Sequence, residues 1–521
     1  MNKSFPAYYP ILFSTNPVLL LLSANISDLP LSQAFPGILV LPLLAGLLTW
    51  LLQRLLKDSH RAAFIVFLGV FWFFFYGTVR MVAAAALAGK LDLSHHAIFL
   101  PIWSLVFLFM GSGFIWRRVQ SPQTITNFLN LVCTLVFVIS VGRIALDLAP
   151  RYLSQPDASQ LIASLPEGQA NKPDIYYIIV DGYARSDVLQ EVFGYDNTAF
   201  LQELEGRGFY IARQSQSNYM QTALSMASAM NLDYMTDLPT AMPDRGQLIG
   251  RIRHSRLRAA LEHLGYNIVN FDSGYIPTTL NDADYFMASD QLPPKRDLEA
   301  YLWINSVAVI LIENQWMEAP ITRFSAQQER IAYTFDHIAQ VPVLPGPKFV
   351  FVHVIVPHPP FIFNAQGPIT PDEYYILSDG NRWVGEAGSA DYIQSYIGQL
   401  EYVNRRILQS IDTILAGSPT PPVIIIQSDH GSGARLNLET AELNCFHERF
   451  SIFNAYYLPG TDTPTPPPDI NAVNSFRFIF NTYLGTSLPL LENHQYYSTW
   501  NQPYRFIDVS EQAQELCPPR P

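Results

Sequence analysis

The sequence predicts an N-terminal α-helical transmembrane domain followed by an α/β domain with a largely parallel sheet, and three observations predict this. Residues 1–150 contain no Glu and only four Asp against nine Lys and Arg, whereas the whole chain of 521 residues has a net charge of −12. The same 150 residues hold five long apolar segments. After them, short apolar runs of strand type alternate with segments of helical pattern, which is typical of an α/β sheet.

The five apolar segments come near the length that spans a bilayer. They are Tyr9–Ala24, Phe35–Leu52, Ala62–Val79, Ala97–Trp116 and Asn127–Leu148. Arg54, Lys57 and Arg61 lie between the second and third segments, and Arg117 and Arg118 between the fourth and fifth. By the positive-inside rule these loops are cytoplasmic. We therefore expect a multi-pass protein of the cell membrane with a cytoplasmic N-terminus and an extracytoplasmic second half.

Three parts are expected: a transmembrane domain of about five helices at 1–150, a polar linker at 151–173 and an outer domain at 174–521. We expect the first apolar segment to be a retained helix, although Lys3 ahead of it leaves a signal peptide as the alternative. The outer part carries the negative charge of the chain, so nucleic acid is not an expected partner.

The outer domain has four apolar runs that predict buried parallel strands. They are Asp174–Val180, Tyr266–Asp272, Lys348–Val356 and Val423–Gln427. Helices are predicted between them at Thr198–Arg207, Arg251–Leu264, Ala326–Ile338 and Ala390–Leu415. Ligands of such sheets bind beyond the carboxyl ends of the strands.

Titratable side chains follow three of these runs. Asp181 follows the first, His358 the third, and Asp429 with His430 the fourth, in the stretch VIIIQSDHGSG. An acid and an imidazole at the tip of a buried strand are costly unless something pairs with them. A divalent cation held by Asp181, Asp429 and His430 would meet that need.

The segment SNYMQTALSMASAMN at Ser217–Asn231 supplies a nucleophile. Thr222 precedes a run of small residues that predicts a helix, whose N-terminus stabilises negative charge. The alternative is that Thr222 only caps the helix. A hydroxyl is a weak nucleophile unless a base or a metal activates it, and the predicted cation would do so.

These motifs resemble the alkaline phosphatase/sulfatase superfamily, in particular its membrane-anchored branch of lipoteichoic acid synthases and phosphoethanolamine transferases. DGYARSDVL after the first strand, Thr222 before a small-residue helix and SDHG after a later strand carry the resemblance. It implies that Asp181, Thr222, Asp429 and His430 are metal ligands and that Thr222 is also the catalytic nucleophile. His358, in PHPPF, would contact the substrate or leaving group. A further histidine is a ligand in some relatives, and His447 is the candidate here.

The sequence departs from the superfamily in two respects. The first ligand is Asp181, where the transferase branch often has Glu. The sulfatase signature C-x-P-x-R is missing, because Cys517 is followed by Pro519 but has Pro521 in place of Arg. True sulfate-ester hydrolysis is therefore disfavoured. Cys445 and Cys517 both lie in the outer domain, and the sequence leaves open whether they pair.

We expect a membrane-bound, metal-dependent transferase that moves a phospho-alcohol group, of phosphoglycerol or phosphoethanolamine type, through a phosphothreonine at the outer membrane face. The donor would be a membrane lipid and the acceptor a glycan or lipid of the cell envelope. One or two divalent ions are expected, and the mixed ligands admit Mn²⁺, Zn²⁺ or Mg²⁺. One alternative is a phosphodiesterase or sulfatase-like hydrolase with the same site. Another is a non-catalytic membrane-anchored module.

Overall fold

The computed structural model describes residues 6–26, 29, 31–87, 95–115, 121–153, 156–166, 172–240, 245–292, 297–314, 316–317, 322–370, 375, 377–383, 386–460 and 464–517. By its internal contacts the chain divides into two compact units. The first comprises Met1–Ala149 and Pro294–Thr322, and the second comprises Pro150–Pro293 and Arg323–Pro521.

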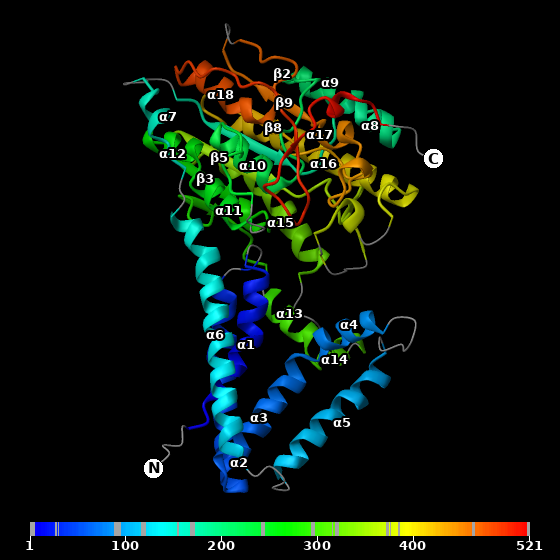
Figure 1. Ribbon diagram of the computed structural model, residues 1–521. Helices are drawn as coiled ribbons and strands as arrows, with labels where there is room; N and C mark the ends of the chain where they lie inside the picture. The colour runs from blue at the N-terminus through cyan, green and yellow to red at the C-terminus, as the bar shows by residue number, and fades with distance from the viewer. Residues whose placement is uncertain are drawn as a thin grey trace. The chain divides into compact units, whose positions relative to one another are not determined.

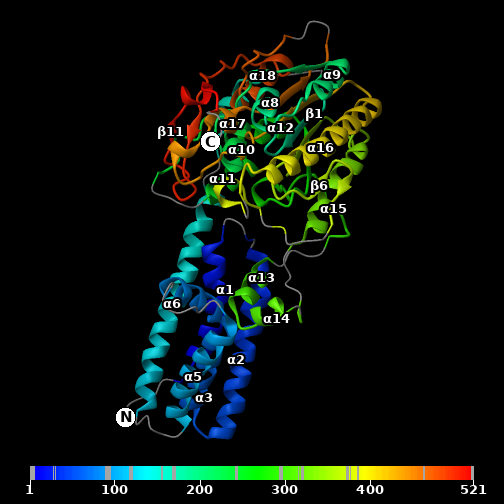
Figure 2. The same cartoon turned by 90° about the vertical axis from the view of Figure 1, so that its right-hand side faces the viewer.

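Each apolar segment of the first unit is helical (Figure 1 and Figure 2). The helices are α1 (Tyr9–Ala24), α2 (Phe35–Leu56), α3 (Ser59–Phe74), α4 (Tyr76–Ala86), α5 (His96–Ile115) and α6 (Pro122–Leu153). By length and composition, the helical stretches Leu31–Leu56 and Pro122–Leu146 can cross a membrane. A third span results if α3 and α4, which meet at 57°, count as one. The five predicted spans and their orientation stay predictions, and Arg117 and Arg118 lie outside the described residues.

The outer faces of these helices are apolar. Leu43 and Leu55 of α2 are 73% and 76% exposed, and Phe109 of α5 is 77% exposed. Apolar surface of this extent is unfavourable in water and marks a face that meets lipid or another protein. The first unit therefore has the composition and surface of a membrane domain.

A segment from the middle of the chain completes the first unit. Its helices α13 (Asp297–Asn305) and α14 (Val309–Glu313) pack among the N-terminal helices. At the break between α3 and α4, the Val307 N–H donates a hydrogen bond to the Phe73 carbonyl at 2.9 Å. Gly77 lies against the backbone of Ile304 and Asn305, where a Cβ would collide. The bend is thus held by residues far away in the sequence.

The second unit is built on a seven-stranded sheet with the order β2-β9-β8-β1-β5-β3-β4. The strands are β1 (Ile175–Val180), β2 (Phe209–Ile211), β3 (Asn267–Phe271), β4 (Tyr285–Met287), β5 (Lys348–Val354), β8 (Val423–Gln427) and β9 (Asn454–Tyr457). The pairs β8-β1, β1-β5, β5-β3 and β3-β4 are parallel, whereas β9 is antiparallel to both β8 and β2. The predicted α/β domain with a largely parallel sheet is confirmed.

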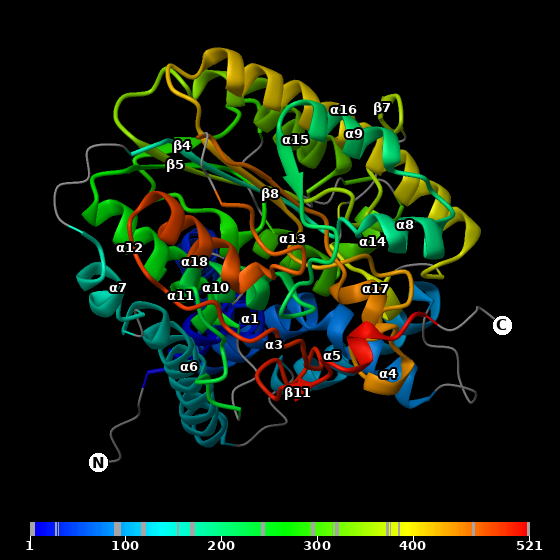
Figure 3. The same cartoon turned by 90° about the horizontal axis from the view of Figure 1, so that it is seen from above.

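Helices cover both faces of this sheet (Figure 3). One layer holds α8 (Ser186–Phe193), α9 (Thr198–Gly206), α15 (Phe324–His337) and α16 (Ala390–Gly417). The other holds α10 (Thr222–Asn231), α11 (Gly246–Arg253), α12 (Arg256–His263) and α18 (Ala472–Tyr483). Along β1, Tyr176 and Ile178 pack into the first layer, and Tyr177 and Ile179 into the second. This burial on both faces explains why the strands read as continuous apolar runs.

The single helix predicted at Arg251–Leu264 is wrong, because two helices occupy this stretch. α11 ends at Arg253, and α12 begins after Ser255. The Ser255 hydroxyl accepts a hydrogen bond from the Arg258 N–H at 3.3 Å, which caps the new helix. The predicted linker at 151–173 includes a short helix, α7 (Ser159–Ala163), but its residues 154–155 and 167–171 lie outside the described residues.

A disulfide joins Cys445 to Cys517, 72 residues apart. Cys445 immediately precedes the short helix α17 (Phe446–Phe450), so the bond fixes the C-terminal segment to that helix. The smaller elements of this unit are β6 (Phe363–Asn364), β7 (Gly367–Pro368), β10 (Tyr496–Tyr497), β11 (Ile507–Asp508) and the 3₁₀ turn η4 (Gly380–Arg382).

Candidate active site

Three neighbouring strands bring most of the sequence-predicted residues to one edge of the sheet. β8, β1 and β5 are adjacent and parallel, so their carboxyl ends lie together. Asp181 follows β1 directly, and Asp429 follows β8 after one residue. Both are only 2% exposed, and His430 is 1% exposed. The structure therefore gathers these groups in one buried place.

Asp181 lies at the centre of this cluster. Its Oδ2 is 3.2 Å from Nε2 of His353, and its Oδ1 is 3.5 Å from Nε2 of His430. Burial by itself raises the pKa of the Asp181 carboxyl. The charge of His358 and the hydrogen bond from His353 outweigh burial and hold the pKa below its usual value. Asp181 is therefore a carboxylate at neutral pH.

Glycines shape the turns that carry the acids. Gly182 has a φ of +71°, which glycine adopts without strain, and its N–H donates to Asp429 Oδ1 at 3.2 Å. A Cβ at Gly431 would overlap the carbonyl oxygen of Glu448, and a Cβ at Gly433 would overlap the carboxylate of Asp379. The glycines of the DHGSG stretch are therefore needed for the close packing of this turn.

His430 presents its Nε2 to the cluster. Its Nδ1 lies 2.9 Å from the Gly431 carbonyl oxygen, which only accepts, so Nδ1 carries the proton and Nε2 keeps its lone pair. Burial and the positive charge of Arg449 lower the pKa of His430, against the opposite effect of Asp429 and Asp181. His430 is therefore neutral at neutral pH, as a metal ligand must be.

Thr222 is the first residue of α10, as the sequence predicts. Gln221 precedes it in an extended conformation and occupies the capping position, so Thr222 is not the cap. Its Oγ1 lies 3.2 Å from Nε2 of His430, which places the hydroxyl beside the buried cluster. The backbone N–H groups of the first helical turn stabilise negative charge on that oxygen.

The cluster fits a divalent cation. Asp181 Oδ1 and Asp429 Oδ2 are buried, and neither accepts a hydrogen bond from the residues that the structure describes. Two groups each offer three ligand atoms within 4.8 Å of one another: Asp181, His358 and His430, and Asp181, His353 and Asp429. Two buried carboxylates with free oxygens are costly unless a positive charge lies between them. Oxygen and imidazole donors of this kind suit Zn²⁺, Mn²⁺ or Mg²⁺.

His358 lies just beyond the carboxyl end of β5, and hydrogen bonds hold its backbone in place. Its N–H donates to the Asp181 carbonyl at 3.0 Å, and the Gln399 side chain donates to the His358 carbonyl at 3.1 Å. Its Nδ1 contacts the carbonyl oxygen of Pro359, so this nitrogen also carries a proton. The other ring nitrogen, Nε2, lies 3.8 Å from Asp379 Oδ2. His358 therefore directs Nε2 towards Asp379.

Sequence reasoning missed Asp379 and Arg449, which lie next to this site. Arg449 Nη1 donates to Asp379 Oδ2 at 3.1 Å, and its Nε and Nη2 donate to the Met220 carbonyl at 2.9 and 2.8 Å. Burial raises the pKa of Asp379, but the charges of His358 and Arg449 outweigh burial and lower it. Arg449 thus ties the segment ahead of Thr222 to the carboxylate beside His358.

His353 was also missed, although the sequence contained a signal for it. It is the single titratable side chain between Phe349 and Val356 in the run KFVFVHVIV, and it is 1% exposed. Its Nδ1 lies 2.8 Å from the Thr278 hydroxyl, and its Nε2 points to Asp181. A histidine inside a central strand needs partners on both nitrogens.

The structure does not bring His447 into either group of ligand atoms. Its Nε2 lies 3.5 Å from Asp187 Oδ2, and its Nδ1 lies 3.4 Å from the Ala513 carbonyl oxygen. Asp187 in turn accepts two hydrogen bonds from Arg185, at 2.8 and 2.7 Å. In this structure His447 therefore belongs to a separate ion-pair cluster, and its role as a further ligand stays a prediction.

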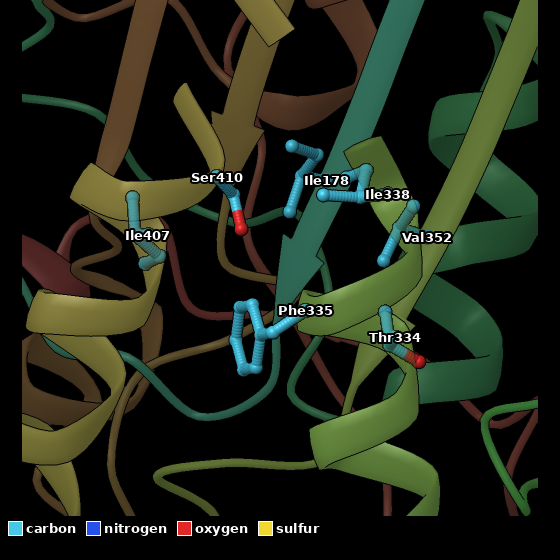
Figure 4. A pocket seen from close by; sticks show the side chains of 7 residues that line it. All are labelled: Ile178, Thr334, Phe335, Ile338, Val352, Ile407 and Ser410. Atoms are coloured by element: carbon cyan, nitrogen blue, oxygen red, sulfur yellow. The ribbon is translucent and has the colours of Figure 1, made fainter. Parts of the chain in front are cut away.

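A cavity elsewhere in the second unit is not part of the site (Figure 4). It lies under α15 and α16 and is lined by Ile178, Thr334, Phe335, Ile338, Val352, Ile407 and Ser410. The Thr334 hydroxyl is already bonded to the Arg330 carbonyl at 2.9 Å. With an almost wholly apolar lining, the cavity is a packing defect rather than a ligand site.

The family model described as Sulfatase matches residues 173–465, which is more than half of the chain. No curated protein matches the sequence. Among solved structures, the periplasmic domain of EptC from Escherichia coli is similar, with a TM-score of 0.42, 12% identity, and 66% of this chain and 97% of that chain covered. The soluble domain of lipooligosaccharide phosphoethanolamine transferase A from Neisseria meningitidis has a TM-score of 0.35, 13% identity and coverage of 57% and 80%. The phosphonate monoester hydrolase of Agrobacterium radiobacter has a TM-score of 0.36 and 13% identity, with 63% of this chain and 80% of that chain covered.

Proposed function

Because the chain belongs to the sulfatase family and is an enzyme of the alkaline phosphatase/sulfatase superfamily, we propose that it is a metal-dependent transferase of a phospho-alcohol group. The observation that carries this proposal is the position of Thr222 Oγ1, 3.2 Å from His430 Nε2 at a cluster with two unsatisfied carboxylate oxygens. A hydroxyl at the start of a helix, next to a cation site, is suited to attack phosphorus.

In the first half-reaction the Thr222 oxygen forms a bond to phosphorus, and the bond from phosphorus to the donor alcohol breaks. The Thr222 proton is lost to solvent, and His358 Nε2 gives a proton to the leaving alkoxide. Asp379, 3.8 Å away, stabilises the protonated imidazole before this transfer. A bound divalent cation would lower the pKa of the Thr222 hydroxyl and neutralise charge on the phosphoryl oxygens.

In the second half-reaction an acceptor hydroxyl attacks the phosphothreonine and gives its proton to His358. The bond between Thr222 and phosphorus breaks, and the Thr222 oxygen takes a proton from solvent, which restores the enzyme. The two half-reactions share one site, so the kinetics are ping-pong.

The apolar first unit favours a lipid donor and location of the second unit at the outer membrane face. Helical stretches at Leu31–Leu56 and Pro122–Leu146 are long and apolar enough to cross a membrane. A membrane anchor of this size brings the site to lipid headgroups, which a hydrolase of soluble substrates does not need. The proposed acceptor is a glycan or lipid of the cell envelope. A phosphodiesterase, in which water replaces the acceptor, is the second candidate, because the geometry around Thr222 serves both reactions.

The test is the intact mass of the full chain after exposure to vesicles of candidate donor lipids. We expect a phospho-alcohol adduct on Thr222 that is absent in Thr222→Ala. Thr198→Ala is the matched control, because Thr198 is the first residue of α9 and is exposed, away from the cluster. An adduct that persists in Thr222→Ala would show that Thr222 is not the nucleophile. If water is the sole acceptor when lipid and glycan are offered together, the enzyme is a hydrolase.

A further inference from the structure

A cationic and aromatic cluster lies next to the candidate active site and takes no part in the chemistry above. It consists of Arg245, Arg382 and Trp500, which come from three separate segments of the second unit. We propose that this cluster binds a second anionic group of the substrate, distinct from the phosphodiester that reacts. The inference rests on the proposed function, whose substrate it narrows.

The three side chains share one ring. The guanidinium carbon of Arg245 lies 3.9 Å from the centre of the Trp500 ring, and that of Arg382 lies 4.8 Å from it. Trp500 is 37% exposed and Arg382 is exposed, so an incoming ligand can reach both. Stacking on the indole holds the Arg382 guanidinium in place while its N–H edge faces the ligand.

Hydrogen bonds connect the cluster to the nucleophile. Arg245 Nη2 donates to the Gln221 side-chain oxygen at 2.9 Å and to the Trp500 carbonyl at 2.6 Å. Gln221 immediately precedes Thr222 and is 6% exposed, and its amide donates to the Ser498 carbonyl at 3.2 Å. The cluster is therefore built onto the start of α10, where Thr222 lies.

A second connection leads to the proposed proton donor. The Arg382 N–H donates to the Asp379 carbonyl at 3.1 Å, in the turn η4. Asp379 is the carboxylate that lies 3.8 Å from His358 Nε2. The cluster thus adjoins the site on both the Thr222 side and the His358 side, as expected for a subsite that holds one end of the substrate.

The charge of the cluster favours an anion. In the part of the chain that the structure describes, the Arg382 guanidinium contacts the Trp500 ring and forms no ion pair with a carboxylate. Both guanidinium groups lie against the same Trp500 ring.

The shape of guanidinium groups selects the ligand chemistry. Their parallel N–H bonds match the two oxygens of a carboxylate or a phosphate. The substrate is therefore a phosphodiester that carries a phosphate or carboxylate beside the reacting phosphorus, rather than one with only neutral groups there.

The experiment compares three chromogenic diesters with the full-length protein: p-nitrophenyl 2-carboxyethyl phosphate, its isosteric amide p-nitrophenyl 2-carbamoylethyl phosphate, and p-nitrophenyl 2-phosphoethyl phosphate. We expect kcat/KM about tenfold higher for a charged diester than for the amide, since charge-assisted hydrogen bonds at a part-exposed site are worth about this factor. The carboxylate and phosphate arms show which anion fits better. In Arg382→Gln the preference for the charged diesters over the amide should disappear.

Arg405→Gln is the matched control, because Arg405 is also an exposed arginine that lies over an aromatic ring. Its guanidinium carbon is 6.0 Å from the centre of the Tyr402 ring on α16. This variant should keep the preference. Equal rates with charged and neutral diesters, or a preference that survives Arg382→Gln, would overturn the inference.

The same diesters are titrated by calorimetry into the Thr222→Ala protein, so that binding is measured without turnover. If the charged diesters bind more tightly than the amide, and Arg382→Gln abolishes this difference, the subsite is supported. If in addition the native protein releases no p-nitrophenolate, the proposed function alone fails. Equal binding of charged and neutral diesters refutes the subsite while leaving the proposed function standing.

Discussion

The histidines of the site are oriented by backbone carbonyls close to them in the sequence. His430 Nδ1 faces the Gly431 carbonyl, and His358 Nδ1 faces the Pro359 carbonyl. Each carbonyl fixes the proton on Nδ1 and leaves Nε2 for the site. Residues next to these histidines in the sequence therefore set the tautomer of each ring, and no long-range contact is needed for it.

His353 gives the first prediction at this scale. It touches Asp181 from within β5 and so orients the carboxylate that both groups of ligand atoms share. We expect His353→Ala to lower affinity for the divalent ion by about 10- to 100-fold, measured by titration of the metal-stripped protein. His263→Ala, at an exposed position that ends α12, should leave the affinity unchanged. Equal affinities of the two variants would contradict a role for His353 in the metal site.

The second prediction concerns the glycine after His430. Gly431→Ala forces a methyl group into the carbonyl of Glu448 and should lower the free energy of unfolding by about 1–3 kcal/mol, the usual cost of overpacking. Gly206→Ala, at the end of α9 with no neighbour within 4 Å of the added carbon, should be neutral or stabilising by up to about 1 kcal/mol. Urea unfolding of both variants checks this. A neutral Gly431→Ala would mean that the turn relaxes.

At the residue scale, the sequence predicted the groups that come directly after strands and missed those that depend on loops. Asp181, Asp429 and His430 could be found because a buried strand draws attention to the polar residues at its carboxyl end. Asp379 and Arg449 lie outside the strands, and they meet only because the turn after Asp379 packs against α17 and Gly433. Nothing in the local pattern specifies that contact.

At the scale of elements, the four central strands were predictable because they are buried on both faces. β2 and β4 have three residues each, and β9 has four, so their apolar pattern is too short to stand out. The division of α11 from α12 depends on the side chain of one serine, Ser255. Propensity alone does not distinguish such a cap from a serine on a helix surface.

The disulfide gives the prediction at this scale. It closes a loop of 72 residues, for which chain entropy gives about 4 kcal/mol of stabilisation. Replacing both Cys445 and Cys517 by Ser should lower the free energy of unfolding by about 2–4 kcal/mol. The midpoint of urea unfolding measures the loss, and Cys133→Ala in the same protein controls for removal of a thiol. A double variant as stable as the native chain would show that α17 needs no covalent support.

At the scale of the whole molecule, the sequence could not show that α13 and α14 belong to the first unit. Leu298 and Val309 are buried there, and Glu313 pairs with His96 at 2.7 Å. An apolar helix pattern shows that one face is buried but not which core buries it. The segment lies inside the stretch that matches the sulfatase family, so that match does not reveal it either.

This assignment leads to a last prediction, made for the full chain in lipid nanodiscs. Trp316 lies in the segment that joins the first unit and is 78% exposed, whereas Val343 lies in the second unit and is 81% exposed. Exposed tryptophan next to apolar helices is typical of the membrane interface. A nitroxide attached to Trp316→Cys should therefore be more accessible to oxygen, and one on Val343→Cys to a water-soluble nickel chelate. The native cysteines do not compete, because Cys133 is buried and the other two are bonded.

Leu43→Cys on α2, 73% exposed, serves as the reference for a position in lipid. If Leu43→Cys is protected from nickel but Trp316→Cys is as accessible to it as Val343→Cys, the segment carrying α13 and α14 lies in water and does not reach the membrane. If all three positions are equally open to nickel, the first unit itself is not embedded. Trp316 and Val343 have nearly equal exposure in the structure. Only the unit to which each residue belongs can therefore produce the expected difference in accessibility to oxygen and nickel.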